Sequence, residues 1–321
     1  MNFGASHQQR GLALITAVLV VAIVATTAAT LALGEQVWFR QSQNMADRAQ
    51  AESLRQGALN YATILLARDL KLNSNGMDHL GEPWAQPLPP FPVENGLIVF
   101  GASDAQGLFN LNNLVKNGVP SPDDNDMFVL LLTALGLNPE LRFALIDWID
   151  ADPNVTPGGG AEDTEYLSLP RPYRTANRLL ESVDELRLVR GFDAKTVEKL
   201  RPFVTALPRP TTINVNTAPE QVLAALFRSP PGATLKPLLT NRVNQPFPDV
   251  TTFASQFPPG NQPLPVTGVT TNYFLVNIDV RYGRLQRRTL ALVHRPQGAP
   301  TTVLWHQLPP IQFETEPDEK T

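Results

Sequence analysis

The feature that most constrains this chain is an uncharged apolar segment close to its N-terminus. Leu12 to Gly34 is 23 residues long, rich in Leu, Val, Ile, Ala and Thr, and contains no charged residue. As a helix rising about 1.5 Å per residue, it is long enough to span a hydrocarbon core of about 30 Å. A secretory signal peptide has a shorter apolar core followed by a small-residue cleavage site. We therefore interpret the run as a retained transmembrane helix.

The residues before the apolar run indicate its orientation and its processing. Arg10 is the only Lys or Arg in the first eleven residues. Because positive charge is retained in the cytoplasm, we expect the N-terminus inside and the bulk of the chain outside. The segment Gln9 to Thr16, with its Arg-Gly pair before an apolar helix, resembles a prepilin peptidase site. Cleavage after Gly11 would make Leu12 the new N-terminus. The alternative is a plain signal anchor with a chance Arg-Gly pair.

Because of this resemblance, the residue at position 16 is informative about the place of the subunit in a filament. In most members of the pilin superfamily the fifth mature residue is Glu, thought to neutralise the terminal amine of a neighbouring subunit. Counted from Leu12, the fifth residue here is Thr16. Because an unpaired carboxylate in hydrocarbon is costly, Thr16 is what we expect in a subunit that has no subunit above it in a filament.

A helical pattern continues beyond the membrane segment. Apolar residues recur at spacings of four, three, four and seven, which is typical of one face of an amphipathic helix. They are Leu54, Ala58, Tyr61, Leu65 and Leu72. The sequence therefore predicts one helix from about 12 to 72, with its first half in lipid and its second half on a globular domain.

The rest of the chain reads as strands, then helices, then strands again. A turn at Asn95-Gly96 precedes a strand at 97–100, and 108–112 alternates apolar and polar residues. Strong strand signals return at 272–294, where Gly283 marks a hairpin turn. Further elements are expected between these regions: helices at 127–135, 139–149, 182–190 (with a Ser182–Glu185 capping box) and 194–205, and a strand at 212–216.

This order predicts an α+β fold, in which a long N-terminal helix packs on a small antiparallel sheet with a large all-helical insertion. Pilins are among the few folds built this way. We expect a leader at 1–11 and the membrane part of the helix at 12–34. An α/β domain would comprise 35–120 and 206–321, and the helical insertion 121–205.

Three sequence features resemble the K-type minor pseudopilin family of type II secretion systems (general secretion pathway protein K). They occur in the family's order and, with Thr16, cover most of the chain. They are Gly107–Leu114 (GLFNLNNL), Asp147–Asp152 (DWIDAD) with Gly159–Asp163 and Tyr166-Leu167, and Leu186–Gly191 (LRLVRG) with Thr212–Ala218 (TINVNTA). Some relatives carry a cysteine pair, whereas this chain has no cysteine.

The resemblance implies a location, partners and processing. It implies a single-pass protein of the bacterial inner membrane with its C-terminal bulk in the periplasm. Its expected partners are the I- and J-type minor pseudopilins, the pseudopilus and the prepilin peptidase, which in this superfamily also methylates the new N-terminus, here Leu12. The helical insertion would cap the filament because its bulk blocks addition of another subunit.

An acidic segment is the candidate metal site. Between Asp147 and Tyr166 there are six carboxylates and no Lys or Arg. Oxygen ligands around a Gly-rich loop suit calcium, and the absence of Cys and of nearby His disfavours zinc or copper. The family binds calcium in its helical domain, so the resemblance favours Ca²⁺. The candidate ligands are Asp150, Asp152, Glu162 and Asp163. A solvated acidic loop, or pairing with Arg171, Arg174 and Arg178, remains the alternative.

We found no enzyme signature in the sequence. The four histidines are far apart, and Gly101–Ala105 lacks the second glycine of a nucleophile elbow. Gly158–Gly160 is not followed by the Lys-Ser/Thr of a phosphate loop. We therefore predict that the chain is not an enzyme. The resemblance implies a subunit at the pseudopilus tip that supports protein export across the outer membrane.

The alternative function is DNA binding, as a helix-hairpin-helix membrane protein of a competence or type IV pilus system. Residues Leu186 to Leu200 resemble that motif, which presents backbone N–H groups to phosphates. However, residues 121–205 contain 15 Asp and Glu against nine Lys and Arg, and the whole chain has a net charge of −4. Because this charge repels a duplex, we expect no nucleic acid partner. A basic group on the predicted hairpin, Arg281, Arg284, Arg287 and Arg288, is interpreted as a solvated strand face or as a contact for an acidic neighbour.

Overall fold

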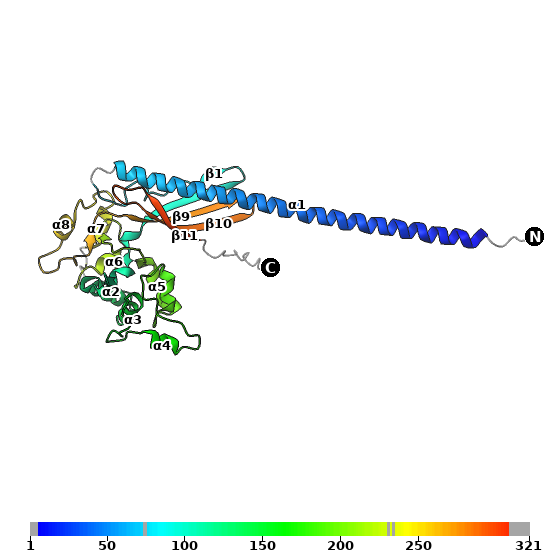
Figure 1. Cartoon of the computed structure of the whole chain (residues 1–321). Coiled ribbons are helices and arrows are strands. Elements are labelled where there is room, and N and C mark those ends of the chain that lie inside the picture. The colour runs from blue at the N-terminus through cyan, green and yellow to red at the C-terminus, as the bar shows by residue number, and fades with distance from the viewer. Residues whose placement is uncertain (1–5, 73–75, 230–231, 233–234, 308–321) are drawn as a thin grey trace, which may run out of the picture.

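A computed structural model describes residues 6–72, 76–229, 232 and 235–307 of the chain, with side-chain surroundings from residue 12 onward. Its dominant element is α1 (Ser6–Leu72), a helix of 67 residues that projects far beyond the globular part (Figure 1). The long helix expected from about 12 to 72 is thus confirmed, and it begins earlier, at Ser6; residues 6–11 contain no proline that would stop it. Residues 1–5 of the expected leader and 308–321 of the expected α/β domain lie outside the described residues.

The C-terminal half of α1 lies on a five-stranded antiparallel sheet, as the sequence predicts. The strand order is β1-β2-β9-β10-β11. The hairpin expected at 272–294 is present, and its turn contains Gly283 at φ 56°. The strand expected at 97–100 is longer, because β2 pairs with β9 along its whole length. The strand bounds are β1 Phe91–Val93, β2 Gly96–Asp104, β9 Tyr273–Tyr282, β10 Leu285–His294 and β11 Thr302–Gln307.

The face of α1 that packs on the sheet differs from the predicted stripe. Of the predicted stripe, Ala58 is buried and Leu54 and Leu65 pack against the same cluster. Tyr61 and Leu72 are instead 46% and 70% exposed, and Leu59 and Leu66 are fully buried. Two core-facing positions of the true stripe carry the charged residues Arg55 and Asp69, of which Arg55 is 4% exposed. An apolar pattern cannot include those positions, so the predicted face is rotated by about one residue from the observed one.

The region between β2 and β9 is mainly helical. The predicted helix at 182–190 is wrong in type, because 183–188 forms a 3₁₀-helix (η3, Val183–Leu188), and the helix expected at 194–205 ends as an α-helix at Leu200. The strands predicted at 108–112 and 212–216 shrink to two residues each. The helices are α2 Pro122–Ala134, α3 Leu141–Ile149, α4 Asp163–Leu167, α5 Ala194–Leu200, α6 Glu220–Ala224, α7 Leu235–Asn241 and α8 Val250–Ala254. The short strands are β3 Phe109–Asn110, β4 Val115–Lys116, β5 Val119–Pro120, β6 Val204–Thr205, β7 Ile213–Asn214 and β8 Thr267–Gly268.

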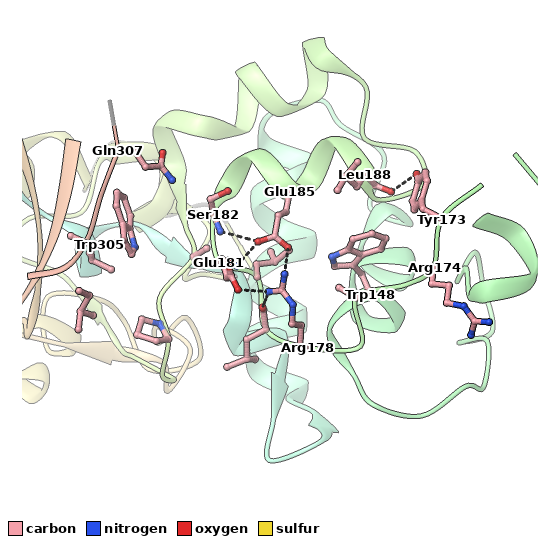
Figure 2. A pocket seen from close by; sticks show the side chains of 17 residues that line it. Trp148, Tyr173, Arg174, Arg178, Glu181, Ser182, Glu185, Leu188, Trp305 and Gln307 are labelled. Atoms are coloured by element: carbon pink, nitrogen blue, oxygen red, sulfur yellow. Dashed lines mark hydrogen bonds and ion pairs between the residues drawn. The ribbon is translucent and has the colours of Figure 1, made fainter. Parts of the chain in front are cut away.

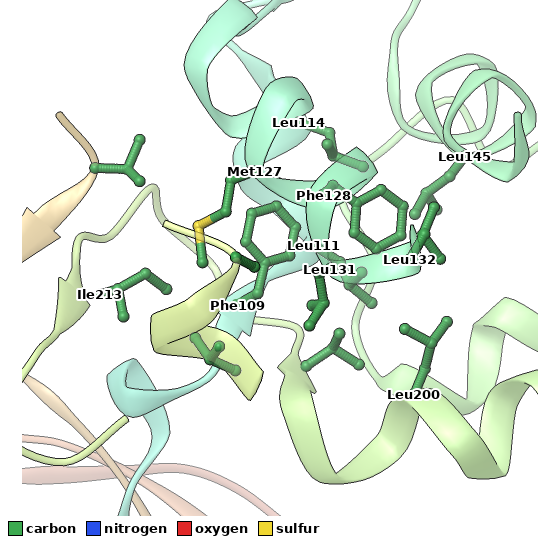
Figure 3. Packing of buried hydrophobic residues seen from close by; sticks show 14 of the residues in the cluster. Phe109, Leu111, Leu114, Met127, Phe128, Leu131, Leu132, Leu145, Leu200 and Ile213 are labelled. Carbon is green, nitrogen blue, oxygen red and sulfur yellow. The ribbon is translucent and has the colours of Figure 1, made fainter. Parts of the chain in front are cut away.

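A single hydrophobic cluster stabilises these helices. Phe109 and Phe128 stack with ring centroids 5.3 Å apart, and Leu131, Leu145 and Leu200 surround them (Figure 3). The cluster includes buried residues from Phe109 to Val266, so helical packing continues on both sides of 121–205. A separate cluster joins α1 to the sheet. The domain boundaries proposed from the sequence stay a prediction.

Buried asparagines hydrogen-bond the helical region to the segments through which the chain enters and leaves it. The side chain of Asn112 donates to the carbonyls of Leu180 and Leu207, both at 2.9 Å, and accepts from the amide of Leu180 at 2.8 Å. Asn214 donates to Asp104 Oδ2 at 2.8 Å. These bonds explain why asparagines stand at these places in GLFNLNNL and TINVNTA: each amide satisfies backbone or carboxylate groups that would otherwise be buried unpaired.

Candidate functional site

The membrane end of α1 has no packing partner in the structure. Every residue from 12 to 46 is exposed, including Leu12 at 70% and Val20 at 57%. Within the described residues, α1 is the one helix long and apolar enough to cross a membrane, with a mean hydropathy of 2.5 in its most apolar window. One helix therefore combines a lipid-compatible half with a half that packs on the sheet.

Thr16 satisfies its own hydroxyl within the helix. Its Oγ1 donates to the carbonyl of Leu12 at 3.1 Å and to that of Ala13 at 3.0 Å. A threonine at this position therefore needs no partner from another subunit or from water, whereas a glutamate would. The predicted cleavage position, Gly11, lies inside α1 next to Leu12.

The acidic segment begins where α3 ends. Asp147 and Asp150 are three residues apart at the C-terminal end of α3, so they share a face of the helix. Asp147 accepts the amide of Thr156 at 3.1 Å on both of its oxygens. Gly160 lies close against this carboxylate, and a Cβ added there would clash with Oδ2 of Asp147 and lie 2.6 Å from the carbonyl of Thr156. The loop is thus held tightly around Asp147.

Two carboxylate oxygens in this loop are buried without a hydrogen-bond partner among the described residues. They are Oδ1 of Asp150 and Oε1 of Glu162, on side chains of residues that are 6% and 5% exposed. Burial, followed by the charges of Asp152 and Asp147, raises the pKa of Asp150 to about 6. Burial, together with Asp147 and Asp150, also raises the pKa of Glu162. The loop therefore holds two buried carboxylate oxygens without a partner, on Asp150 and Glu162, and hard cations such as calcium bind such oxygens.

The predicted ligands differ in whether their carboxylate oxygens already have hydrogen-bond partners. Asp150 and Glu162 each keep one buried oxygen without a partner among the described residues. Asp152 lies near enough to raise the pKa of Asp150, and it accepts from the amide of Asn154 at 2.9 Å. Asp163 instead accepts from the amide of Thr175 and from Arg174, each at 3.0 Å. Asp147 belongs to the acidic segment but was not among the predicted ligands, although its i, i+3 spacing from Asp150 was a usable signal.

A second carboxylate cluster was not foreseen at all. Ligand-type oxygens of Asp69, Asp78 and Glu82 lie within 4.8 Å of one another; among the described residues no such group of three lies in the acidic loop. Arg295, 1% exposed, donates to Asp69 at 2.6 Å and also to Asp78. Because the Arg295 guanidinium supplies the positive charge that a metal ion would supply, this cluster is a buried ion network. It links the C-terminal end of α1 to the residue that follows β10. Its members are up to 226 positions apart, so no local motif could have revealed it.

A cleft of about 1140 Å³ separates the helical region from the last strand. Figure 2 shows Trp148 and Tyr173 on the helical side and Trp305 on the sheet side, with Arg178 between Glu181 and Glu185. Arg178 is ion-paired with Glu181 at 3.1 Å and with Glu185 at 3.8 Å. The described lining includes no histidine, cysteine or aspartate, so it presents an apolar surface with neutralised charges.

A long N-terminal helix, half exposed and apolar and half packed on an antiparallel sheet, defines the class of pilin-like subunits. Comparison with known proteins identifies the family within this class. Residues 107–209 and 213–273 each match a family described as type II secretion system (T2SS), protein K. Type II secretion system protein K of Pseudomonas aeruginosa is 41% identical over 233 residues, covering 70% of each chain. The same protein of Pectobacterium carotovorum is 34% identical, covering 89% of this chain and 93% of the relative. The chain belongs to the type II secretion system protein K family and is a minor pseudopilin.

A solved structure agrees with this assignment. A chain of the GspK-GspI-GspJ complex from the type 2 secretion system of enterotoxigenic Escherichia coli has a TM-score of 0.68 and 28% sequence identity. The match covers 84% of this chain and 99% of that one. The family resemblance found in the sequence and the predicted fold class are both confirmed.

Proposed function

We propose that this chain is a non-enzymatic subunit at the tip of a type II secretion pseudopilus and supports protein export across the outer membrane. Its bulk lies in the periplasm, and α1 anchors it in the inner membrane until assembly. A prepilin peptidase cleaves after Gly11 and methylates Leu12. The solved relative is described in a complex with GspI and GspJ, so the proposed partners are the I- and J-type minor pseudopilins.

The observation that carries this proposal is the division of α1 into two surfaces. The uncharged apolar run of α1, residues 12–34, is exposed on every side, whereas Leu59, Ala62 and Leu66 are buried on the sheet. A helix that is apolar all round needs an apolar environment. Lipid supplies it before assembly, and the equivalent helices of partner subunits supply it afterwards.

Thr16 and the helical region are the support for the tip position. Thr16 satisfies itself through Leu12 and Ala13 and offers no carboxylate to the terminal amine of another subunit. The helical region adds bulk beside the far end of α1 (Figure 1). Together they support a subunit that receives no further subunit above it.

We propose in addition that the acidic loop binds calcium. The buried, unpaired oxygens of Asp150 and Glu162 are the support, with Asp147 and Asp152 beside them. The ion would neutralise a group of carboxylates that lacks a cation partner and would fix the loop after α3. Asp163, engaged by Arg174 and Thr175, is the member of the predicted ligand set that this arrangement favours least.

DNA binding is the less favoured function. Gly191 does form a turn, at φ 87°, between η3 and α5. The arginines on this hairpin are engaged, Arg187 with Glu198 at 2.9 Å and Arg201 with Asp184 at 2.6 Å. Because these arginines are already paired with carboxylates in an acidic region, they leave little free positive charge to bind a phosphate backbone.

Deleting the helical region tests the proposal in cells. The variant replaces residues 121–205 by a short Gly-Ser linker in a strain that lacks the native gene. We expect secretion of the system's substrates to be lost, and pseudopili to lose their length control, because the cap is missing. Normal secretion by the deletion variant at wild-type protein level would refute the capping role.

A further inference from the structure

The arginines of the β9–β10 hairpin have a defined place in the fold. Gly283, at the hairpin turn, lies against α1, where a Cβ would come within 3.3 Å of Oδ2 of Asp47. The other end of β10 leads to Arg295, which binds Asp69 near the end of α1. The hairpin turn is therefore the end of the globular part closest to the membrane segment, as Figure 1 shows.

The hairpin carries more positive charge than its surroundings neutralise. Arg281 and Arg288 are 57% and 47% exposed, and both rely on the single carboxylate of Asp279, at 3.8 and 3.7 Å. The pKa of Glu52 is lowered mainly by the hydrogen bond that its carboxyl accepts from Arg55. Arg287 lies close enough to add to this lowering. Arg284 is exposed at the turn itself. Exposed pairs at such distances hold their partners weakly, so the arginines are available to another acidic group.

An anionic membrane is a poor fit for this patch. Asp47, level with the hairpin turn, is 13 residues beyond Gly34, the last residue of the uncharged run. At 1.5 Å per residue this is about 20 Å along an upright helix. That distance is more than twice the Debye length of about 8 Å at physiological ionic strength, so lipid charge is largely screened at the patch.

We propose that the hairpin arginines dock on a carboxylate-rich surface of the filament subunit next to this one on the membrane side. This inference rests on the proposed assembly function. Subunits whose long helices pack in parallel place the membrane-facing end of one globular part above the next. The opposite, helical end of this chain is acidic, with 15 Asp and Glu against nine Lys and Arg in residues 121–205. Charge thus separates a docking end from a free end and sets the register of the tip subunit.

Charge reversal at the turn tests the docking surface. Full-length chain is co-expressed with the other pseudopilins of its system, solubilised in detergent and recovered through an affinity tag in low and high salt. We expect Arg281→Glu with Arg284→Glu to reduce partner recovery about tenfold in low salt, because like charges now face each other. Arg281→Gln with Arg284→Gln should fall between it and wild type, which separates charge from folding effects.

The matched control places the same charge change at the other end. Arg171 and Lys195 are exposed in the helical region, and Arg171→Glu with Lys195→Glu should leave recovery within twofold of wild type. Equal recovery for the hairpin and control variants overturns the docking surface while leaving the assembly function in place. Self-association of the chain through the hairpin, with normal partner recovery, also overturns it. If wild type recovers no pseudopilin, the proposed function fails with it.

Discussion

At the scale of single residues, charged groups occupy core positions that an apolar pattern reserves for hydrophobic ones. Asp69 is 9%, Asp78 3% and Glu82 7% exposed, with Arg295 beside them at 1%. The indole of Trp84 donates to Glu82 at 2.8 Å, and Arg295 also lies over the ring of Phe274 at 4.5 Å. Three carboxylates with one guanidinium leave excess negative charge, so the network favours holding a proton.

The network makes stability depend on pH. Burial raises the pKa of Glu82 from 4.5 to about 7, against the smaller effect of its hydrogen bond from His79. The folded state therefore binds a proton more tightly than the unfolded one. Its contribution is full below pH 4.5 and is lost as the pH rises to about 7. Screened by nearby solvent, it amounts to roughly 2 kcal/mol.

Chemical denaturation between pH 5 and pH 8 measures this effect. The free energy of unfolding of wild type should fall over that range, and Glu82→Gln should remove about 2 kcal/mol of the fall. The difference between the two pH profiles isolates Glu82 from Asp150, which titrates in the same direction. Parallel profiles for wild type and Glu82→Gln would show that Glu82 is already ionised in the folded protein.

Calcium should act through Asp150. We expect Ca²⁺ to raise the melting temperature of wild type by several degrees at pH 7.5 and by less at pH 5, since the ligands must lose their protons. Asp150→Asn should abolish the shift, yet in EDTA it should be at least as stable as wild type because it removes a buried unpaired charge. Asp126→Asn, at an exposed carboxylate paired with Arg228, is the control. Equal calcium shifts in all three proteins would contradict the site.

How much of the candidate site the sequence could predict depends on distance along the chain. The acidic loop lies within 20 residues, so its charge is visible in the sequence, and pairing with Arg174 was an alternative there; only the fold shows that Asp163 is the carboxylate that Arg174 pairs with. The Asp69–Asp78–Glu82–Arg295 network joins residues from the beginning and the end of the globular part of the sequence. In the sequence, its charged residues cannot be told from ordinary surface residues. Pairing across more than 200 positions is a property of the fold alone.

At the scale of elements, the docked half of α1 should be far more sensitive to mutation than its solvent face. Leu66 is fully buried, whereas Ile64 two residues earlier is 65% exposed. We expect Leu66→Ala to cost about 2–5 kcal/mol of unfolding free energy and Ile64→Ala less than about 0.5 kcal/mol. Denaturant titration of the two variants provides the comparison. Similar losses for both would mean that α1 is not docked on the face described.

Long elements were predictable and short ones were not. The α1 helix and the β9–β10 hairpin repeat their pattern over many residues, so each signal is reinforced along its length. Residues 183–188 form a 3₁₀-helix, and the chain turns three residues later at Gly191, where a Cβ would lie 2.7 Å from Leu141. The two-residue strands at 109–110 and 213–214 depend on parallel partners distant in sequence.

At the scale of the whole molecule, position 16 should decide where the subunit stands in a filament. A Thr16→Glu variant carries the carboxylate that other subunits use, so we expect it to enter the shaft as well as the tip. Immunogold labelling along overproduced pseudopili measures this, with Thr26→Glu, elsewhere in the same helix, as control. Label confined to the ends for Thr16→Glu would contradict the link between Thr16 and the tip.

The proposed role of α1 is that of an assembly element and not only of an anchor. Mass spectrometry of the full-length protein, purified from cells that carry its prepilin peptidase, tests this most directly. We predict a mature chain that begins at Leu12 with a methylated amine, and a chain with an intact leader when the peptidase is absent. A chain that keeps Met1 in the presence of the peptidase would contradict the account and leave α1 as a plain signal anchor.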